Sequence, residues 1–110
     1  MIWFLNMVVW DKNQLQSCIN KLYQSVFGED IYPTNFHKAA AFLECMISTH
    51  PLSDGNKRTA FQGMLFILDK EGYKLTRTYD QSRSFIVNIL QKNIQIDGIV
   101  RWLKRNSKKY

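Results

Sequence analysis

Apolar residues recur through most of the chain at intervals of three and four, which is the spacing of an amphipathic helix. The first stripe comprises Leu15, Cys18, Ile19 and Leu22. The same spacing predicts later helices over residues 34–49, 56–71, 81–92 and 96–103. Either Thr34 or Asn35 can cap the second helix. Because Pro51 disfavours helical geometry at His50, that helix should end near Thr49.

The helical pattern breaks once, in the stretch SVFGEDIYPT at residues 25–34. Gly28 and Pro33 interrupt it, and β-prone residues surround the central Gly-Glu-Asp. We predict a loop or a short hairpin here. The rest of the chain after Asp11 is expected to be helical, with a short connector at residues 74–79, so the fold class is all-α.

Composition favours one globular domain. The chain has 110 residues, of which 45% are hydrophobic and 14% aromatic. This length supports a single modest core, and this apolar content excludes an intrinsically disordered chain. No linker, repeat or low-complexity tract divides the sequence, so residues 1–110 are treated as a single domain.

The first ten residues, MIWFLNMVVW, form an apolar N-terminal segment. They are too few to span a bilayer, which takes about 20 residues. They also lack the basic start and the small-residue cleavage site of a signal peptide. We expect this segment to be buried against the domain or a partner, and we expect no membrane partner.

The formal net charge of +6 suits an anionic partner such as a nucleotide, a nucleic acid or an acidic protein. Part of the excess lies in the final stretch, RWLKRNSKKY. That run is short and has no base-reading pattern, so we interpret it as a solvated helix end and tail. Nucleic-acid binding is the weakest of the functional hypotheses.

The two cysteines, Cys18 and Cys45, lie in apolar helical surroundings. We interpret them as reduced core residues and not as a disulfide. Reduced cysteines are typical of cytoplasmic proteins, so a cytoplasmic location is expected.

A polar cluster, HPLSDGNKR, begins at His50 between two predicted helices. It leads into a helix N-terminus, where unpaired N–H groups and the helix dipole attract anions. Gly55 permits close backbone approach, and Lys57 and Arg58 add positive charge where a phosphate chain would lie. Asp54 fits Mg²⁺, which binds one or two carboxylates together with substrate phosphates. His50 is placed to take a proton from a hydroxyl.

Together these residue types predict transfer of a phosphate-containing group to a hydroxyl. Taken singly, each has an ordinary structural explanation. His50 and Pro51 can simply end a helix, Asp54 can cap the next one, and the two bases can be solvated. The cluster is not a Walker A loop, because G-x-x-x-x-G-K-[ST] is absent.

The stretch HPLSDGNKRTA resembles the signature of the Fic/Doc (Fido) family, written roughly H-P-F-x-[D/E]-G-N-[G/K]-R. Eight of the nine signature positions match. The segments FGEDIYPTNFHKAAAFLECMISTHP before it and LFILDKEGYKL after it are similar to the Doc-type, "death on curing" branch, as is DKNQLQSCI. The likeness covers roughly residues 11–105. Doc-type chains usually begin with an additional helix, which we expect this domain to lack.

The resemblance implies a small helical bundle with a short β-hairpin flap, near residues 24–33, that clamps the backbone of a target protein. It implies that His50 is the catalytic general base and that Asp54 binds Mg²⁺. The implied nucleotide-binding residues are Gly55, Asn56, Lys57 and Arg58.

Three positions depart from the AMP-transferring Fic pattern. Leu52 replaces a phenylalanine that anchors the loop, Lys57 replaces a glycine, and Phe61 replaces a second arginine. The last two are similar to Doc-type toxins, which are thought to deliver the γ-phosphate of ATP. The resemblance thus favours a kinase-like protein phosphotransferase that uses ATP and Mg²⁺ on a Ser/Thr hydroxyl. It suggests elongation factor Tu as the target and translation arrest as the outcome.

Two alternatives remain at this point. One is AMP transfer (AMPylation) to a protein hydroxyl. The other is a catalytically weak Fic-fold binding module, favoured by the shortened N-terminus and by Leu52. The family's inhibitory signature, [S/T]-x-x-x-E-[G/N], is absent, because Ile67 precedes Glu71 by four residues. Inhibition is therefore expected to come from a separate antitoxin.

Overall fold

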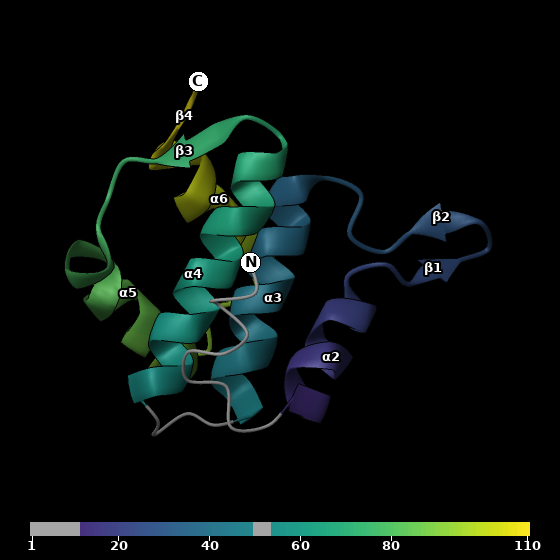
Figure 1. Cartoon of the computed structure of the whole chain (residues 1–110), viewed down its shortest axis with the longest axis horizontal. Coiled ribbons are helices and arrows are strands. Elements are labelled where there is room, and N and C mark those ends of the chain that lie inside the picture. The colour runs from purple at the N-terminus through teal and green to yellow at the C-terminus, as the bar shows by residue number, and fades with distance from the viewer. Residues whose placement is uncertain (1–11, 50–53) are drawn as a thin grey trace.

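Two helices, α3 and α4, form the centre of the structure, and the other elements pack around them (Figure 1). The computed structural model describes residues 12–49 and 54–110. Its helices are α2 (Lys12–Lys21), α3 (Asn35–Thr49), α4 (Asp54–Lys70), α5 (Tyr79–Gln91) and α6 (Ile96–Arg105). Its strands are β1 (Ser25–Val26), β2 (Glu29–Asp30), β3 (Tyr73–Leu75) and β4 (Ser107–Lys109). This mainly helical bundle confirms the predicted fold class, while the apolar segment 1–10 lies outside the described residues.

Helices α3 and α4 run antiparallel. Thr34 caps α3, since its hydroxyl accepts a hydrogen bond of 3.1 Å from the backbone N–H of His37. The side-chain amide of Asn35 donates a 2.9 Å hydrogen bond to the backbone carbonyl of Ile67. This bond ties the start of α3 to the last turns of α4. The opposite ends of the two helices, at Thr49 and Asp54, are thereby held together as a corner.

A glycine allows these two helices to approach closely. Gly63 in α4 lies against the ring of Phe42 in α3, and a Cβ on Gly63 would be only 2.3 Å from Cε2 of that ring. Phe42 itself is buried. The aromatic ring therefore occupies the space that a side chain at position 63 would need.

The core fills the space between α3, α4 and the helices around them. It is built from the apolar stripes that the sequence predicts on α2, α3, α4, α5 and α6. Its largest fully buried apolar side chains are Leu22, Leu43, Met46, Ile47, Met64, Leu68, Ile86, Ile99 and Leu103. Helices α5 and α6 also meet through parallel stacking of Phe85 on Trp102, with ring centroids 4.3 Å apart. These contacts place α5 and α6 as fixed supports around the central pair.

A short hairpin, β1–β2, projects from the bundle between α2 and α3 (Figure 1). Its antiparallel pairing sets Ser25 opposite Asp30 and Val26 opposite Glu29. The two turn residues, Phe27 and Gly28, have φ angles of 53° and 81°, and positive φ at both positions is what a tight type I′ hairpin turn requires. The hairpin lies where the sequence predicts one.

A second strand pair was not predicted. The sequence was interpreted as a connector at residues 74–79 and a solvated C-terminal tail, but β3 and β4 pair antiparallel, with Lys74 opposite Lys108. Leu75 of β3 is buried in the core. Three-residue strands are too short to show the apolar–polar alternation that identifies a strand in a sequence. Their pairing joins residues far apart in the chain, which the sequence pattern does not reveal.

The prediction of two reduced cysteines is wrong for this structure. Cys18 of α2 and Cys45 of α3 form a disulfide, with Cα atoms 5.8 Å apart. Two apolar helical stripes that pack together bring both side chains to the same interface, and sequence alone does not reveal that proximity. The bond fixes α2, and with it the base of the hairpin, to α3.

Replacing Gly63 by alanine should destabilise the protein. Helix propensity alone favours alanine over glycine by about 1 kcal/mol. The clash with Phe42 should outweigh this preference and lower the free energy of unfolding by about 1–3 kcal/mol, measured by urea denaturation. Adding Phe42→Leu should make the cost of Gly63→Ala smaller, because it frees the space beside position 63. A Gly63→Ala variant as stable as the wild type would contradict this packing.

Reducing the disulfide should lower the free energy of unfolding by about 3.5 kcal/mol in the chain-entropy model, because the bond closes a loop with a sequence separation of 27. Denaturation with and without dithiothreitol measures the difference. A Cys18→Ala/Cys45→Ala variant serves as the control, since its stability should not respond to the reductant. Finding two titratable thiols in denatured, unreduced protein would show that the bond does not form.

Candidate active site

The corner between α3 and α4 carries the polar cluster found in the sequence. Helix α3 ends at Thr49 and α4 begins at Asp54, two residues earlier than predicted. The structure therefore places Asp54, Gly55 and Asn56 in the first turn of α4, with Lys57 and Arg58 directly after them. His50 and residues 51–53 lie outside the described residues, as do the side chains of residues 54–56.

The electrostatics of this corner favour an anion. Helix α4 has 17 residues, and its first backbone N–H groups have no partners within the helix. The positive end of the helix dipole adds to the charges of Lys57, which is half-buried, and Arg58, which is exposed. These residues fit the phosphates of ATP. A carboxylate at position 54 also fits Mg²⁺, since Mg²⁺ bound with phosphates takes one or two protein carboxylates.

An aromatic pair stands beside Arg58. The guanidinium carbon of Arg58 lies 4.5 Å from the ring centroid of Tyr79, the first residue of α5. The ring of Phe61, one turn after Arg58, meets the ring of Tyr79 edge-on, with centroids 5.5 Å apart and an interplanar angle of 74°. Arg58, a candidate phosphate-binding residue on α4, therefore contacts a ring from another helix, α5.

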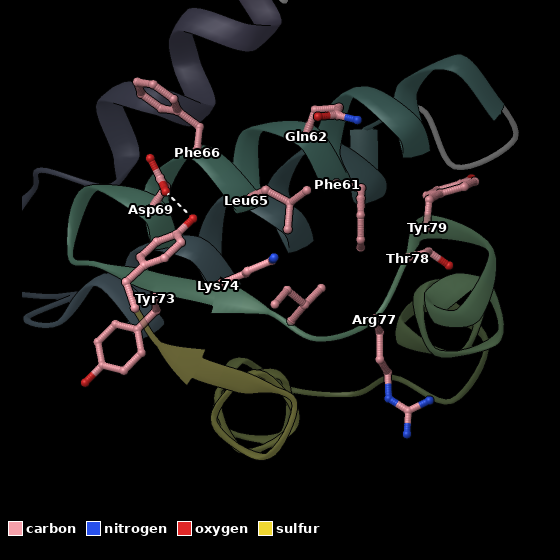
Figure 2. Close-up of a pocket in the computed structure, with 12 residues that line it drawn as sticks. Phe61, Gln62, Leu65, Phe66, Asp69, Tyr73, Lys74, Arg77, Thr78 and Tyr79 are labelled. Atoms are coloured by element: carbon pink, nitrogen blue, oxygen red, sulfur yellow. Dashed lines mark hydrogen bonds between the residues drawn. The ribbon is translucent and has the colours of Figure 1, made fainter.

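A cavity of about 540 Å³ runs along α4 from Phe61 toward Asp69, between this helix, β3 and the start of α5 (Figure 2). Five aromatic side chains contribute to its lining: Phe61, Phe66, Tyr73, Tyr79 and Tyr110. Lys74 and Arg77 add positive charge. Its lining includes Tyr79, the ring that Arg58 contacts, so the cavity lies next to a candidate phosphate-binding residue.

Tyr110 and Asp69 meet at the far end of this cavity. The hydroxyl of Tyr110 donates a 2.6 Å hydrogen bond to Oδ1 of Asp69 (Figure 2). This bond to a carboxylate raises the pKa of Tyr110 above its ordinary value, with smaller contributions from desolvation and from the charge of Asp69. The bond joins the residue that follows β4 to α4.

Sequence reasoning did not find Tyr79. It read the residue as the end of a connector, whereas Thr78 caps α5 through a full capping box with Gln81 and makes Tyr79 the first helical residue. The T-x-x-Q pattern at residues 78–81 was the local signal for that boundary. No local pattern indicates that the ring then reaches Arg58, 21 positions earlier in the chain.

Comparison with known proteins identifies the family. The model of the Fic/DOC family matches residues 6–68, which include α3, the corner and most of α4. The chain belongs to the Fic/DOC family. It is also 36% identical over 93 residues to Toxin Doc of Mycolicibacterium smegmatis, covering 83% of this chain and 72% of that protein. No solved structure gives a significant match.

The family match includes the corner that geometry and charge single out. His50, Asp54, Gly55, Asn56, Lys57 and Arg58 all fall within the Fic/DOC match. Among the described parts of the chain, no helix is both long and apolar enough to cross a membrane.

Proposed function

We propose that this Fic/DOC protein is a Doc-like toxin that transfers the γ-phosphate of ATP to a Ser/Thr hydroxyl of a protein target. The observation that carries the proposal is the start of α4 at Asp54. It makes the sequence DGNKR the first turns of a long helix that directly follows the corner. A carboxylate, a glycine and two bases at the positive end of a helix dipole suit a metal-bound polyphosphate.

In the proposed reaction, His50 takes the proton of the target hydroxyl as its oxygen attacks the γ-phosphorus. The new O–P bond forms as the bond from the γ-phosphorus to the β,γ-bridging oxygen breaks, and ADP leaves. Gly55 and Asn56 shape the anion hole, and Lys57 and Arg58 hold the phosphates. Asp54 would hold Mg²⁺, and the bound ion would supply positive charge that offsets the charge of the transferring group.

Lys57 favours phosphate transfer over AMP transfer. It stands at the position where AMP-transferring relatives carry glycine, and it is half-buried on the first turns of α4. A lysine there adds a charged contact with the polyphosphate that glycine cannot make. This contact suits the orientation of ATP in Doc-type toxins, which are thought to deliver the γ-phosphate. AMP transfer is the outcome that the same site would give with ATP in the opposite orientation.

The hairpin β1–β2 supplies the contact with the target. Both of its edges expose backbone groups that can pair with an extended segment of another protein. Phe27 at its tip is fully exposed, and Val26 and Ile31 beside it are also exposed. The proposed occupant is the backbone around the target hydroxyl, in elongation factor Tu by family resemblance, and the outcome is translation arrest.

Similarity to Toxin Doc of Mycolicibacterium smegmatis supports the toxin role. A toxin made in its own host requires control. The chain lacks the inhibitory signature of the family, so the proposed control is a separate antitoxin protein. The proposed place of action is the cytoplasm, where elongation factor Tu is found.

Incubating the protein with Mg²⁺ and ATP, labelled on either the γ-phosphate or the adenine, should transfer only the γ-label to a protein in bacterial lysate. His50→Ala should reduce the transfer by about 100- to 10 000-fold, through loss of the general base. Asp54→Ala should abolish it through loss of the metal ligand. Autoradiography of the separated proteins measures both.

Matched controls separate these roles from general damage. His37→Ala removes the other histidine, which lies at the start of α3 and contacts Thr34. Asp97→Ala removes an acid from the first turn of α6. Both should retain transfer. Adenine label on the target would replace the kinase-like assignment by AMP transfer, and wild-type labelling equal to that of His50→Ala would remove enzymatic function altogether.

A further inference from the structure

The guanidinium of Arg58 is held against an aromatic face. Its central carbon lies 4.5 Å from the centroid of the Tyr79 ring, a close cation–π distance. Arg58 is exposed, and an exposed arginine side chain ordinarily samples many rotamers. Contact with the ring restricts that sampling, because the guanidinium must stay near the ring to keep the contact.

The Tyr79 ring is itself fixed from the α4 side. Phe61 lies three residues after Arg58, on the same face of α4, and its edge-to-face contact with Tyr79 has centroids 5.5 Å apart. Phe61 is only 3% exposed. Arg58 and Phe61 therefore contact the same ring from adjacent turns, one of them from within the core.

The backbone that carries Tyr79 is fixed as well. Thr78 accepts a hydrogen bond from the N–H of Gln81, whose side chain accepts one from the N–H of Thr78. The preceding residue, Arg77, donates a 2.6 Å hydrogen bond from Nε to the side-chain oxygen of Asn106, at the end of α6. Tyr79 thus belongs to a capped helix start, and the residues before it are hydrogen-bonded to the end of α6.

We infer that Tyr79 is a positioning residue for nucleotide binding. The ring limits the positions that the Arg58 guanidinium can take and so keeps it beside the first turns of α4, where the phosphates would bind. The inference rests on the proposed function, in which Arg58 binds the phosphates of ATP.

The energetic consequence is pre-organisation. A free arginine loses rotamer freedom when it binds a phosphate, and that loss weakens binding. An arginine already stacked on Tyr79 has lost part of this freedom before ATP arrives. Removing the ring should therefore weaken ATP binding without removing any group that contacts ATP.

The test is isothermal titration of MgATP into the full chain carrying Tyr79→Leu. The dissociation constant should rise about two- to five-fold, the equivalent of an exposed cation–π contact. Tyr79→Phe keeps the ring, so its affinity should lie closer to that of the wild type than to that of Tyr79→Leu. Tyr23→Leu removes an exposed ring that lies outside this cavity, 5.8 Å from Nζ of Lys38, and should leave the affinity unchanged.

A double-mutant cycle tests whether Tyr79 acts through Arg58. In an Arg58→Ala background, Tyr79→Leu should have no further effect on MgATP affinity, because its effect passes through Arg58. An equal effect in both backgrounds would overturn the inference. So would unchanged affinity in Tyr79→Leu.

A measurement without nucleotide separates the two proposals. Nuclear magnetic resonance should show ring-current shifts of the Arg58 side-chain signals in the wild type and in Tyr79→Phe, but not in Tyr79→Leu. Wild-type protein that fails to bind MgATP would overturn the proposed function and this role together. Binding that depends on Arg58 but not on Tyr79 would overturn only the role of Tyr79.

Discussion

The close packing of α3 against α4 is the constraint on which the rest of the structure depends. Gly63 has no side chain, and the Phe42 ring occupies the space beside it. The Asn35 amide ties the other end of the pair to the Ile67 carbonyl. Because the two helices are held along their length and only residues 50–53 separate Thr49 from Asp54, the end of α3 lies near the positively charged start of α4.

Support for this corner comes from outside the helix pair. The disulfide between Cys18 and Cys45 attaches α2 and the hairpin to α3. On the other side, α5 begins at Tyr79 and places an aromatic ring under Arg58. The hairpin proposed to hold a target and the ring proposed to position Arg58 are thus fixed to the same central pair. This arrangement suits a reaction that needs two substrates held in register.

The sequence predicted what depends on local pattern. Apolar spacing located the helices, Thr34 or Asn35 was named as the cap for α3, and Gly28 marked the hairpin turn. The start of α4 was misplaced by two residues, because Asp54 was read as loop. The features missed depend on contacts distant in sequence. Pairing of β3 with β4, the Cys18–Cys45 bond and the Arg58–Tyr79 contact all join segments that local periodicity treats separately.

The candidate site, too, was predictable from the sequence only in part. The residue types from His50 to Arg58 predicted phosphate chemistry and a resemblance to the Fic/DOC family, and the family match confirms that membership. The role of each residue remains a prediction. Mass spectrometry of purified elongation factor Tu, after incubation with the protein and MgATP, tests the central claim most directly. A mass gain of one phosphoryl group, absent with His50→Ala, is the expected result. A gain of one AMP, or no gain at all, would contradict it.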